Sequence, residues 1–169
     1  SIIESRHEFI RDINDIIGGI HSSITGGKEK IELVYEPNVK SDEFYEQLQK
    51  NREKDFKFRN TSSGPHRDDL CVRINDIDIR KFGSQGQQRT AALSLKLSEI
   101  YLVQKKIKDV PILLLDDVLS ELDANRQNYL LDSIRDVQTM ITCTGLDDFV
   151  NKRFEINKLF KVVEGTVAP

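Results

Sequence analysis

Two short stretches of the sequence carry residues whose types and spacing suit the binding of a phosphate compound. The first is FGSQGQQRT, residues 82–90, which precedes a long helical pattern. Gly83 and Gly86 permit backbone angles that other residues avoid, and serine is a favoured N-cap, so Ser84 would begin a helix there. The unpaired N–H groups of such a helix start predict an anion-binding site.

The second stretch is the pair Asp116 and Asp117, which directly follows the apolar run at residues 112–115. Ligands of α/β sheets gather at the carboxyl ends of strands. A carboxylate held there binds Mg²⁺, usually through water, and its neighbour can orient or deprotonate an attacking water. We therefore predict Asp116 as the metal residue and Asp117 as the catalytic base. The alternative is an acidic strand end that enters a loop, since short motif matches are often accidental.

Hydrophobic periodicity predicts the elements that hold these residues. Helices are expected at residues 2–20, about 42–59, about 87–106 and 123–137, and strands at residues 31–37, 110–117, 139–144 and 159–167. Gly26 and Gly27 would end the first helix, Ser41 would cap the second and Asp123 the last, and a hairpin would turn at Asn75 and Asp76. Alternating helices and apolar strands imply right-handed crossovers in an α/β sheet, with the 110–117 strand covered on both sides.

Composition excludes several classes of function. The 169 residues are 38% hydrophobic and 31% charged, which is typical of a globular protein, and no apolar run is long enough to span a membrane. The first residues, SIIESRHEF, lack the basic region, apolar core and small-residue cleavage site of a secretory signal, so none is expected here. Cys71 and Cys143 lie far apart without further ligands at metal-binding spacing, which favours the reducing cytoplasm.

The net charge of −3 provides no global attraction to nucleic acid, but one run is locally basic. Residues 50–59, KNREKDFKFR, have a net charge of +3. The candidate DNA contacts are Lys50, Arg52, Lys54, Lys57 and Arg59. A solvated helix face is the alternative.

Taken together, the motifs resemble those of a known ATPase family. The segment SQGQQR, residues 84–89, is similar to the signature motif of ABC-type ATPases, ILLLDD to their Walker B strand, and SELD, residues 120–123, to their D-loop. Together with GPHRDD, residues 64–69, they resemble the RecF family. The resemblance implies an α/β fold: residues 61–169 as the C-terminal lobe of an ABC-type ATPase, with a mostly parallel sheet and flanking helices, and residues 1–60 as a mainly helical arm.

One motif of that family is missing from this chain. A P-loop requires G-x-x-x-x-G-K-[ST], and the nearest run, residues 22–29, has Ser22 for the first glycine and Glu29 for the hydroxyl residue. The resemblance implies that the P-loop lies upstream and that this chain is the C-terminal part of a longer protein. Alone it would be inactive, whereas its parent would be a slow DNA-dependent ATPase.

The resemblance also implies roles for individual residues. Ser84, Gln85, Gly86 and Gln87 would bind, in trans, the ATP held by the P-loop of a second subunit. Ser84 would donate its hydroxyl and Gln87 would line the phosphate, while Gln85 favours the RecF branch over transporters, many of which have glycine there. Ser120 and Asp123 would lie at the dimer seam, and Thr144, or alternatively Thr142, would sense the γ-phosphate. His66 and Arg67 either couple the arm to the site or belong to a plain turn with salt bridges.

The function implied is an ATP-dependent DNA-binding recombination mediator. With Mg²⁺ and ATP it would dimerise on double-stranded DNA at gaps and act with RecO, RecR and RecA. The alternatives are an SMC-like head or another ABC-type subunit, and a non-catalytic module that docks DNA or protein.

Overall fold

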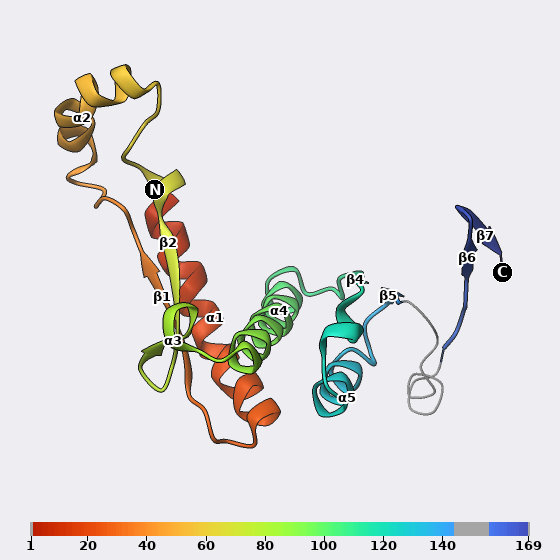
Figure 1. Cartoon of the computed structure of the whole chain (residues 1–169). Helices are drawn as coiled ribbons and strands as arrows, with labels where there is room; N and C mark the ends of the chain where they lie inside the picture. Colours follow the sequence, from red (N-terminus) through yellow and green to blue (C-terminus); the bar gives the residue numbers. More distant parts are fainter. Residues whose placement is uncertain (1, 144–155, 169) are drawn as a thin grey trace. The chain divides into compact units, whose positions relative to one another are not determined.

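The computed structural model describes residues 2–143 and 156–168, which form two compact units, residues 1–111 and 112–169 (Figure 1). The first contains α1 (Ile2–Thr25), β1 (Ile31–Glu36), α2 (Phe44–Phe58), the 3₁₀ turn η1 (Pro65–Arg67), β2 (Asp69–Ile74), β3 (Ile77–Asp78), α3 (Ile79–Phe82) and α4 (Gln85–Ile107). The second contains β4 (Leu113–Asp116), the 3₁₀ turn η2 (Val118–Glu121), α5 (Ala124–Ser133), β5 (Thr139–Thr142), β6 (Lys161–Val163) and β7 (Thr166–Ala168).

The core of the first unit lies between α1 and an antiparallel sheet of order β1-β2-β3. Ile13 and Ile17 are four residues apart, one helical turn, so both point to the same side of α1, and both are fully buried. They belong to one apolar cluster with Ile31 and Leu33, the inward side chains of β1, and Ile74 of β2. Strand β1 alternates buried and exposed residues at its start, as predicted for a half-buried strand.

Helix α4 packs against α1, and small polar residues line one side of α4, with Ser94 next to His21 of α1. Thr90, Ser94 and Ser98 are spaced by four residues and are all buried. Each hydroxyl lies within hydrogen-bond distance of the carbonyl oxygen four residues earlier, at 2.7 Å for Gly86, 2.8 Å for Thr90 and 2.7 Å for Ser94. Because these side chains are small and their hydroxyls are paired, they line a helix contact without an unsatisfied polar group.

The turns of the first unit agree in part with the sequence predictions. Helix α1 ends at Gly26 and Gly27, both with positive φ, as predicted. The hairpin turn at Asn75 and Asp76 is confirmed, since both residues have the positive φ of a type I′ turn and Ile74 pairs with Ile77. The predicted cap at Ser41 is wrong. Residues 41–43 form a turn, and α2 begins after Glu43, which makes no side-chain cap.

Strands β1 and β2 pair from Ile31 with Ile74 to Glu36 with Asp69, and α2 belongs to the segment between them. In Figure 1, α2 lies beyond the ends of these two strands. Helix α1 packs against β1 in the core of the first unit. The division into an arm at residues 1–60 and a lobe at residues 61–169 stays a prediction.

In the second unit, β4 and β5 pair in parallel, from Leu113 with Thr139 to Asp116 with Thr142, which confirms a parallel pair. The expectation that the 110–117 strand is covered on both sides is wrong for the described residues. Successive side chains point to opposite faces, and Leu114 and Met140, neighbours across the pair, are 69% and 62% exposed. The end of the chain forms a hairpin, β6 with β7, and not the single edge strand that was predicted.

Helix α5 ends earlier than predicted, at Ser133, because residues 134–137 form a turn in which the Val137 amide donates to Ile134 at 3.0 Å. The side chains expected to point inward still do so, since Leu130, Ile134 and Val137 are buried.

One titratable side chain lies fully buried in the first unit. His21 of α1 places Nδ1 2.9 Å from the Ser94 hydroxyl and Nε2 3.2 Å from the Glu29 carboxylate. Burial lowers the pKa of His21 below its ordinary value of 6.5, although the Glu29 hydrogen bond opposes this change. The folded protein therefore holds His21 as a neutral imidazole at neutral pH.

This burial predicts a pH-dependent stability. Because the folded state binds a proton at His21 less readily than the unfolded chain, stability is fully present above about pH 6.5 and is lost as the pH falls below it. We expect the free energy of unfolding to fall between about pH 7.5 and about pH 5.5, with His21 contributing at most about 1.4 kcal/mol per pH unit. Urea unfolding of His21→Gln should show a shallower pH dependence. Ser23→Gln, on an exposed part of α1, should keep the original slope, and equal slopes for all three proteins would contradict the prediction.

Candidate functional site

The start of α4 is built as a capping box, which confirms the predicted helix start at Ser84. The Ser84 hydroxyl accepts from the Gln87 amide at 3.2 Å, and the Gln87 side-chain oxygen accepts from the Ser84 amide at 3.0 Å. Ser84 and Gln85 are exposed. Since the Ser84 oxygen acts as an acceptor in this bond, its own proton remains for a second acceptor.

The sequence predicts unusual backbone angles at Gly83 and Gly86, but the structure shows ordinary angles at both. Gly83 has an ordinary extended conformation, φ −77° and ψ 145°, and Gly86 lies in the first turn of α4, so the interpretation as unusual backbone angles is wrong. What Gly83 supplies is space. A Cβ there would lie 2.5 Å from the Ile79 carbonyl oxygen and 2.7 Å from the Ile79 Cβ. Any other residue would push α3 away from the start of α4.

Both polar atoms of the Gln87 side-chain amide form hydrogen bonds. Its oxygen belongs to the capping box, and its Nε2 donates to Glu29 Oε1 at 2.9 Å. Glu29, from the loop after α1, was considered only as a mismatch to a P-loop, and the sequence contains no signal for this long-range contact. The expectation that Gln87 lines a phosphate stays a prediction.

In the second unit, Asp116 and Asp117 both form hydrogen bonds with Thr142, the last residue of β5. The Thr142 hydroxyl donates to the Asp116 carboxylate. The Asp117 amide is directed at Thr142, 3.2 Å from its carbonyl oxygen and 3.1 Å from its hydroxyl oxygen. The structure thus brings together the two aspartates and one of the two threonines considered for the switch. The other, Thr144, lies outside the described residues.

The backbone changes direction at Asp117, which has the left-handed conformation with φ 51°. Its carbonyl accepts from the Ser120 hydroxyl at 2.8 Å, and η2 begins at the next residue. Consequently both carboxylates are exposed at the carboxyl end of β4. Among the described residues, no cluster of three or more His, Cys, Asp or Glu could bind a metal ion. A single exposed carboxylate suits Mg²⁺, which retains several waters.

Asp123 has the predicted structural role. Its Oδ1 accepts from the amides of Asn125 and Arg126, each at 3.1 Å, and its Oδ2 forms an ion pair with the Arg126 guanidinium. The hydrogen bond from the Arg126 amide lowers the pKa of Asp123. Asp123 is therefore the N-cap of α5, and the proposed position of Asp123 and Ser120 at a dimer seam stays a prediction.

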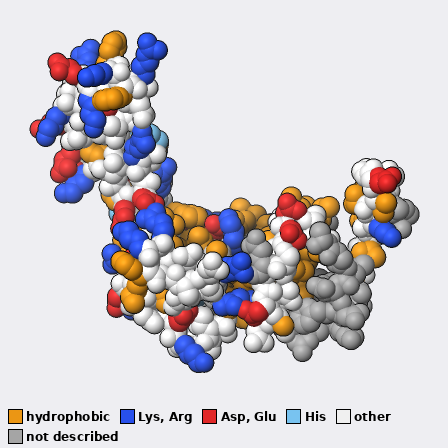
Figure 2. All heavy atoms as spheres, viewed as in Figure 1, with side chains coloured by type: hydrophobic (Ala, Val, Ile, Leu, Met, Phe, Trp, Pro, Cys, Tyr) orange, Lys and Arg blue, Asp and Glu red, His pale blue; other side chains and the backbone are white. Residues whose placement is uncertain are grey.

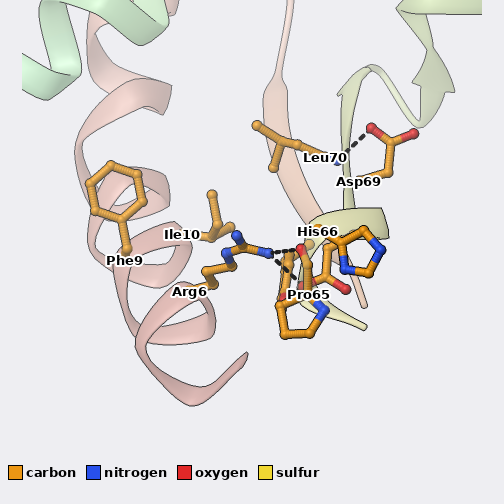
Figure 3. Close-up of a pocket in the computed structure, with 9 residues that line it drawn as sticks. Arg6, Phe9, Ile10, Pro65, His66, Asp69 and Leu70 are labelled. Atoms are coloured by element: carbon orange, nitrogen blue, oxygen red, sulfur yellow. Dashed lines mark hydrogen bonds and ion pairs between the residues drawn. The ribbon is translucent and has the colours of Figure 1, made fainter. Parts of the chain in front are cut away.

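The GPHRDD segment forms a turn that is attached to α1 (Figure 3). Arg6 donates to the Pro65 carbonyl at 2.5 Å and to Asp68 Oδ2 at 2.6 Å, and the Tyr35 hydroxyl also donates to Asp68. Burial raises the pKa of Asp68, but hydrogen bonds from Tyr35, the Asn38 amide and Arg6 together lower it. The predicted turn with salt bridges is confirmed, although Arg6 and Tyr35 were not identified from the sequence.

A shallow pocket of about 430 Å³ lies beside this turn, with Phe9, Ile10 and Leu70 as its apolar part. His66 is exposed there and contacts the Thr61 carbonyl at 2.8 Å, and Arg67 is also exposed. Arg6 and Asp68 bind each other in the pocket wall, so their charges are already compensated. The coupling of arm and site through His66 and Arg67 stays a prediction.

Helix α2 carries the basic run and buries none of its residues. Figure 2 shows Lys and Arg side chains gathered over this part of the molecule. Helical spacing separates them into two groups. Lys50, Lys54 and Lys57 follow one side of α2, whereas Arg52 lies on another side with Tyr45 and Phe56, which are 74% and 87% exposed. The basic residues of α2 therefore lie on two separate sides of the helix and do not form one continuous surface.

The chain is similar to known proteins in both its sequence and its fold. No protein-family profile matches the chain. The chain is 60% identical over 166 residues to the DNA replication and repair protein RecF of Lachnospira eligens and 58% identical over 166 residues to that of Agathobacter rectalis. Each alignment covers 98% of this chain and 46% of the relative, so the chain spans about half the length of the curated relatives it matches.

Two solved structures of the recombination mediator protein RecF in the RecFOR pathway match the fold, one described as RecF-ATP and one as RecF-ATPrS. Their TM-scores are both 0.79, with 35% and 33% identity, and they cover 99% and 98% of this chain and 46% of their own. The predicted α/β fold class of an ABC-type ATPase lobe is confirmed by this match. No helix in the described part of the chain has the length and apolar character needed to cross a membrane. Across nearly its whole length, the chain belongs to the RecF family.

Proposed function

We propose that this chain supplies the trans half of an ATP site in a DNA-binding recombination mediator. The observation that supports this most directly is the capped, exposed start of α4 at Ser84, in a chain that is 60% identical to a RecF protein. A relative solved as RecF-ATP supports ATP as the ligand. ATP bound by the rest of one subunit would meet Ser84 of a second, which makes the nucleotide the link of a homodimer.

The chemistry proposed for the α4 start is anion binding. The positive end of the helix dipole and the Ser84 hydroxyl proton favour a negatively charged γ-phosphate. Gln85 and Gly86 belong to the first turn of α4, at the positive end of the helix dipole. Gln87 holds the turn in shape through the capping box, and its side chain would line the phosphate only by leaving that arrangement.

At the end of β4, Asp116 would hold Mg²⁺ through water and Asp117 would act as the base for an attacking water. When bound, Mg²⁺ would neutralise phosphate charge. Thr142 orients the Asp116 carboxylate and binds the Asp117 backbone, so it is a positioning group for both. Thr144, two residues further on, is proposed as the γ-phosphate switch, and Ser120 and Asp123 as dimer contacts.

The proposed partners are double-stranded DNA at gap junctions and the proteins RecO, RecR and RecA, in the bacterial cytoplasm where the chromosome lies. The two solved relatives described as RecF in the RecFOR pathway support RecO and RecR, whereas RecA and gap junctions follow from the family resemblance alone. For DNA, the side of α2 with Lys50, Lys54 and Lys57 is favoured, since lysines in a row suit a phosphate backbone. Arg52 and Arg59 would contribute from the neighbouring surface.

Replacing Ser84 with arginine in a full-length family member tests the trans site. We expect Ser84→Arg to weaken the ATP-dependent dimer at least about tenfold, because the longer side chain occupies the space into which the phosphate must approach. Sedimentation with ATP and Mg²⁺ measures this. Ser23→Arg is the control for an added arginine. Unchanged dimer affinity in Ser84→Arg would contradict the proposal.

Replacing Asp117 with asparagine separates turnover from binding. Loss of a general base lowers the rate of ATP hydrolysis by roughly 10²–10⁴-fold, whereas dimerisation with ATP should persist. Phosphate release and sedimentation of the same full-length variant measure the two effects. Hydrolysis at the normal rate would show that Asp117 is not the base.

Charge reversal on α2 tests the DNA surface. The double variant Lys50→Glu, Lys54→Glu of this chain should bind duplex DNA more weakly, with a log–log salt dependence less steep by about 2. Fluorescence anisotropy across a salt series measures both quantities. The matched control reverses two other exposed lysines, Lys28→Glu and Lys105→Glu. Equal losses in the two double variants would indicate only a general effect of net charge.

A further inference from the structure

A continuous line of hydrogen bonds leads from the interior of the first unit to the start of α4. Ser94 and His21 are fully buried, Glu29 is partly buried, and Gln87 belongs to the capping box. We propose that Glu29 is a positioning residue for Ser84: through Gln87 it sets the geometry of the capping box. The inference rests on the proposed function of Ser84 in binding nucleotide.

Glu29 connects two elements through its two carboxylate oxygens. Oε1 accepts from Gln87 Nε2 at 2.9 Å, and Oε2 lies 3.2 Å from His21 Nε2. The Glu29 side chain is 22% exposed, so its carboxylate is partly removed from water and depends on these donors. The loop after α1 is thereby bonded to the first turn of α4.

The protonation of the network follows from which groups can donate. A carboxylate accepts only, so His21 must carry its proton on Nε2 to donate to Glu29. Because burial keeps the ring neutral, Nδ1 is then an acceptor 2.9 Å from the Ser94 hydroxyl, which shares its single proton between Nδ1 and the Thr90 carbonyl. Each hydrogen bond from His21 through Glu29 to Gln87 therefore has one donor and one acceptor, and the orientation of the Gln87 amide is determined.

That orientation matters for the capping box. The Gln87 amide has one oxygen and one nitrogen, and the capping box needs the oxygen directed at the Ser84 amide. With Glu29 holding Nε2, a rotated amide would place oxygen against the carboxylate, which is repulsive. Glu29 thus selects the one amide orientation that supports the cap and prearranges the Ser84 hydroxyl before any phosphate arrives.

The first test uses this chain and does not involve nucleotide. In Glu29→Ala, hydrogen exchange by NMR at the amides of Ser84 and Gln87 should accelerate roughly fivefold, the size of one capping interaction. The Ser98 amide, in the middle of α4, should exchange at its original rate and so reports that the unit remains folded. Glu32→Ala, an exposed glutamate of β1, is the matched control and should change none of the three.

Conservative variants distinguish positioning from simple packing. In Glu29→Gln, the new side chain can accept from Gln87 and donate to His21, whose proton moves to Nδ1, so the exchange rates should return close to the original. Glu29→Asp keeps the charge but is one methylene too short to reach both partners, so it should behave like Glu29→Ala. If Glu29→Gln exchanges as fast as Glu29→Ala, the proposed network is wrong.

The second test measures ATP-dependent dimerisation in a full-length family member. Glu29→Ala should weaken the dimer roughly fivefold, and Glu29→Gln and Glu32→Ala should not. If Ser84→Arg leaves dimerisation unchanged, the proposed function fails, and the exchange data still decide the role of Glu29. If Ser84→Arg weakens the dimer while Glu29→Ala alters neither exchange nor dimer affinity, or alters exchange alone, the inference about Glu29 is overturned.

Discussion

The packing of α1 against α4 is the contact on which the first unit depends. It brings Ala91 and Leu102 of α4 into the apolar cluster of Ile13 and Ile17, and it places a buried imidazole next to a buried hydroxyl, His21 against Ser94. Both polar groups are tolerated because each finds a partner, and an unpaired group there would cost about 1–3 kcal/mol. The same contact places Glu29 where it reaches Gln87, so the packing of two helices determines the local geometry at the start of α4.

The second unit depends on the parallel pairing of β4 with β5, which places the carboxyl ends of these two strands side by side. The register that sets Asp116 opposite Thr142 is a property of the backbone, and the hydroxyl-to-carboxylate contact follows from it. Asp117 then turns the chain away with a left-handed backbone. This combination exposes two acidic side chains at the carboxyl end of β4, the position from which the proposed phosphate chemistry would use them.

Both proposed sites therefore share one principle: a residue that would touch the ligand is oriented by hydrogen bonds from neighbouring side chains. Ser84 is held through Gln87 and Glu29, and Asp116 through Thr142. Arg6 and Tyr35 similarly hold the GPHRDD turn through Asp68. On α2 the basic side chains Lys50, Arg52, Lys54 and Lys57 are all exposed, as the proposed contact to a phosphate backbone needs.

Local signals in the sequence determined the helix start at Ser84, the Asp123 cap, the Asn75–Asp76 turn and the apolar strand that ends in Asp116. Each of these depends on neighbours within a few residues, whose preferences act without the rest of the fold. Only the tertiary structure decided that Gly83 is required for space against Ile79, that Glu29 binds Gln87 and that Arg6 and Tyr35 bind Asp68. Those contacts depend on how the helices, strands and loops pack, which residue type alone does not specify.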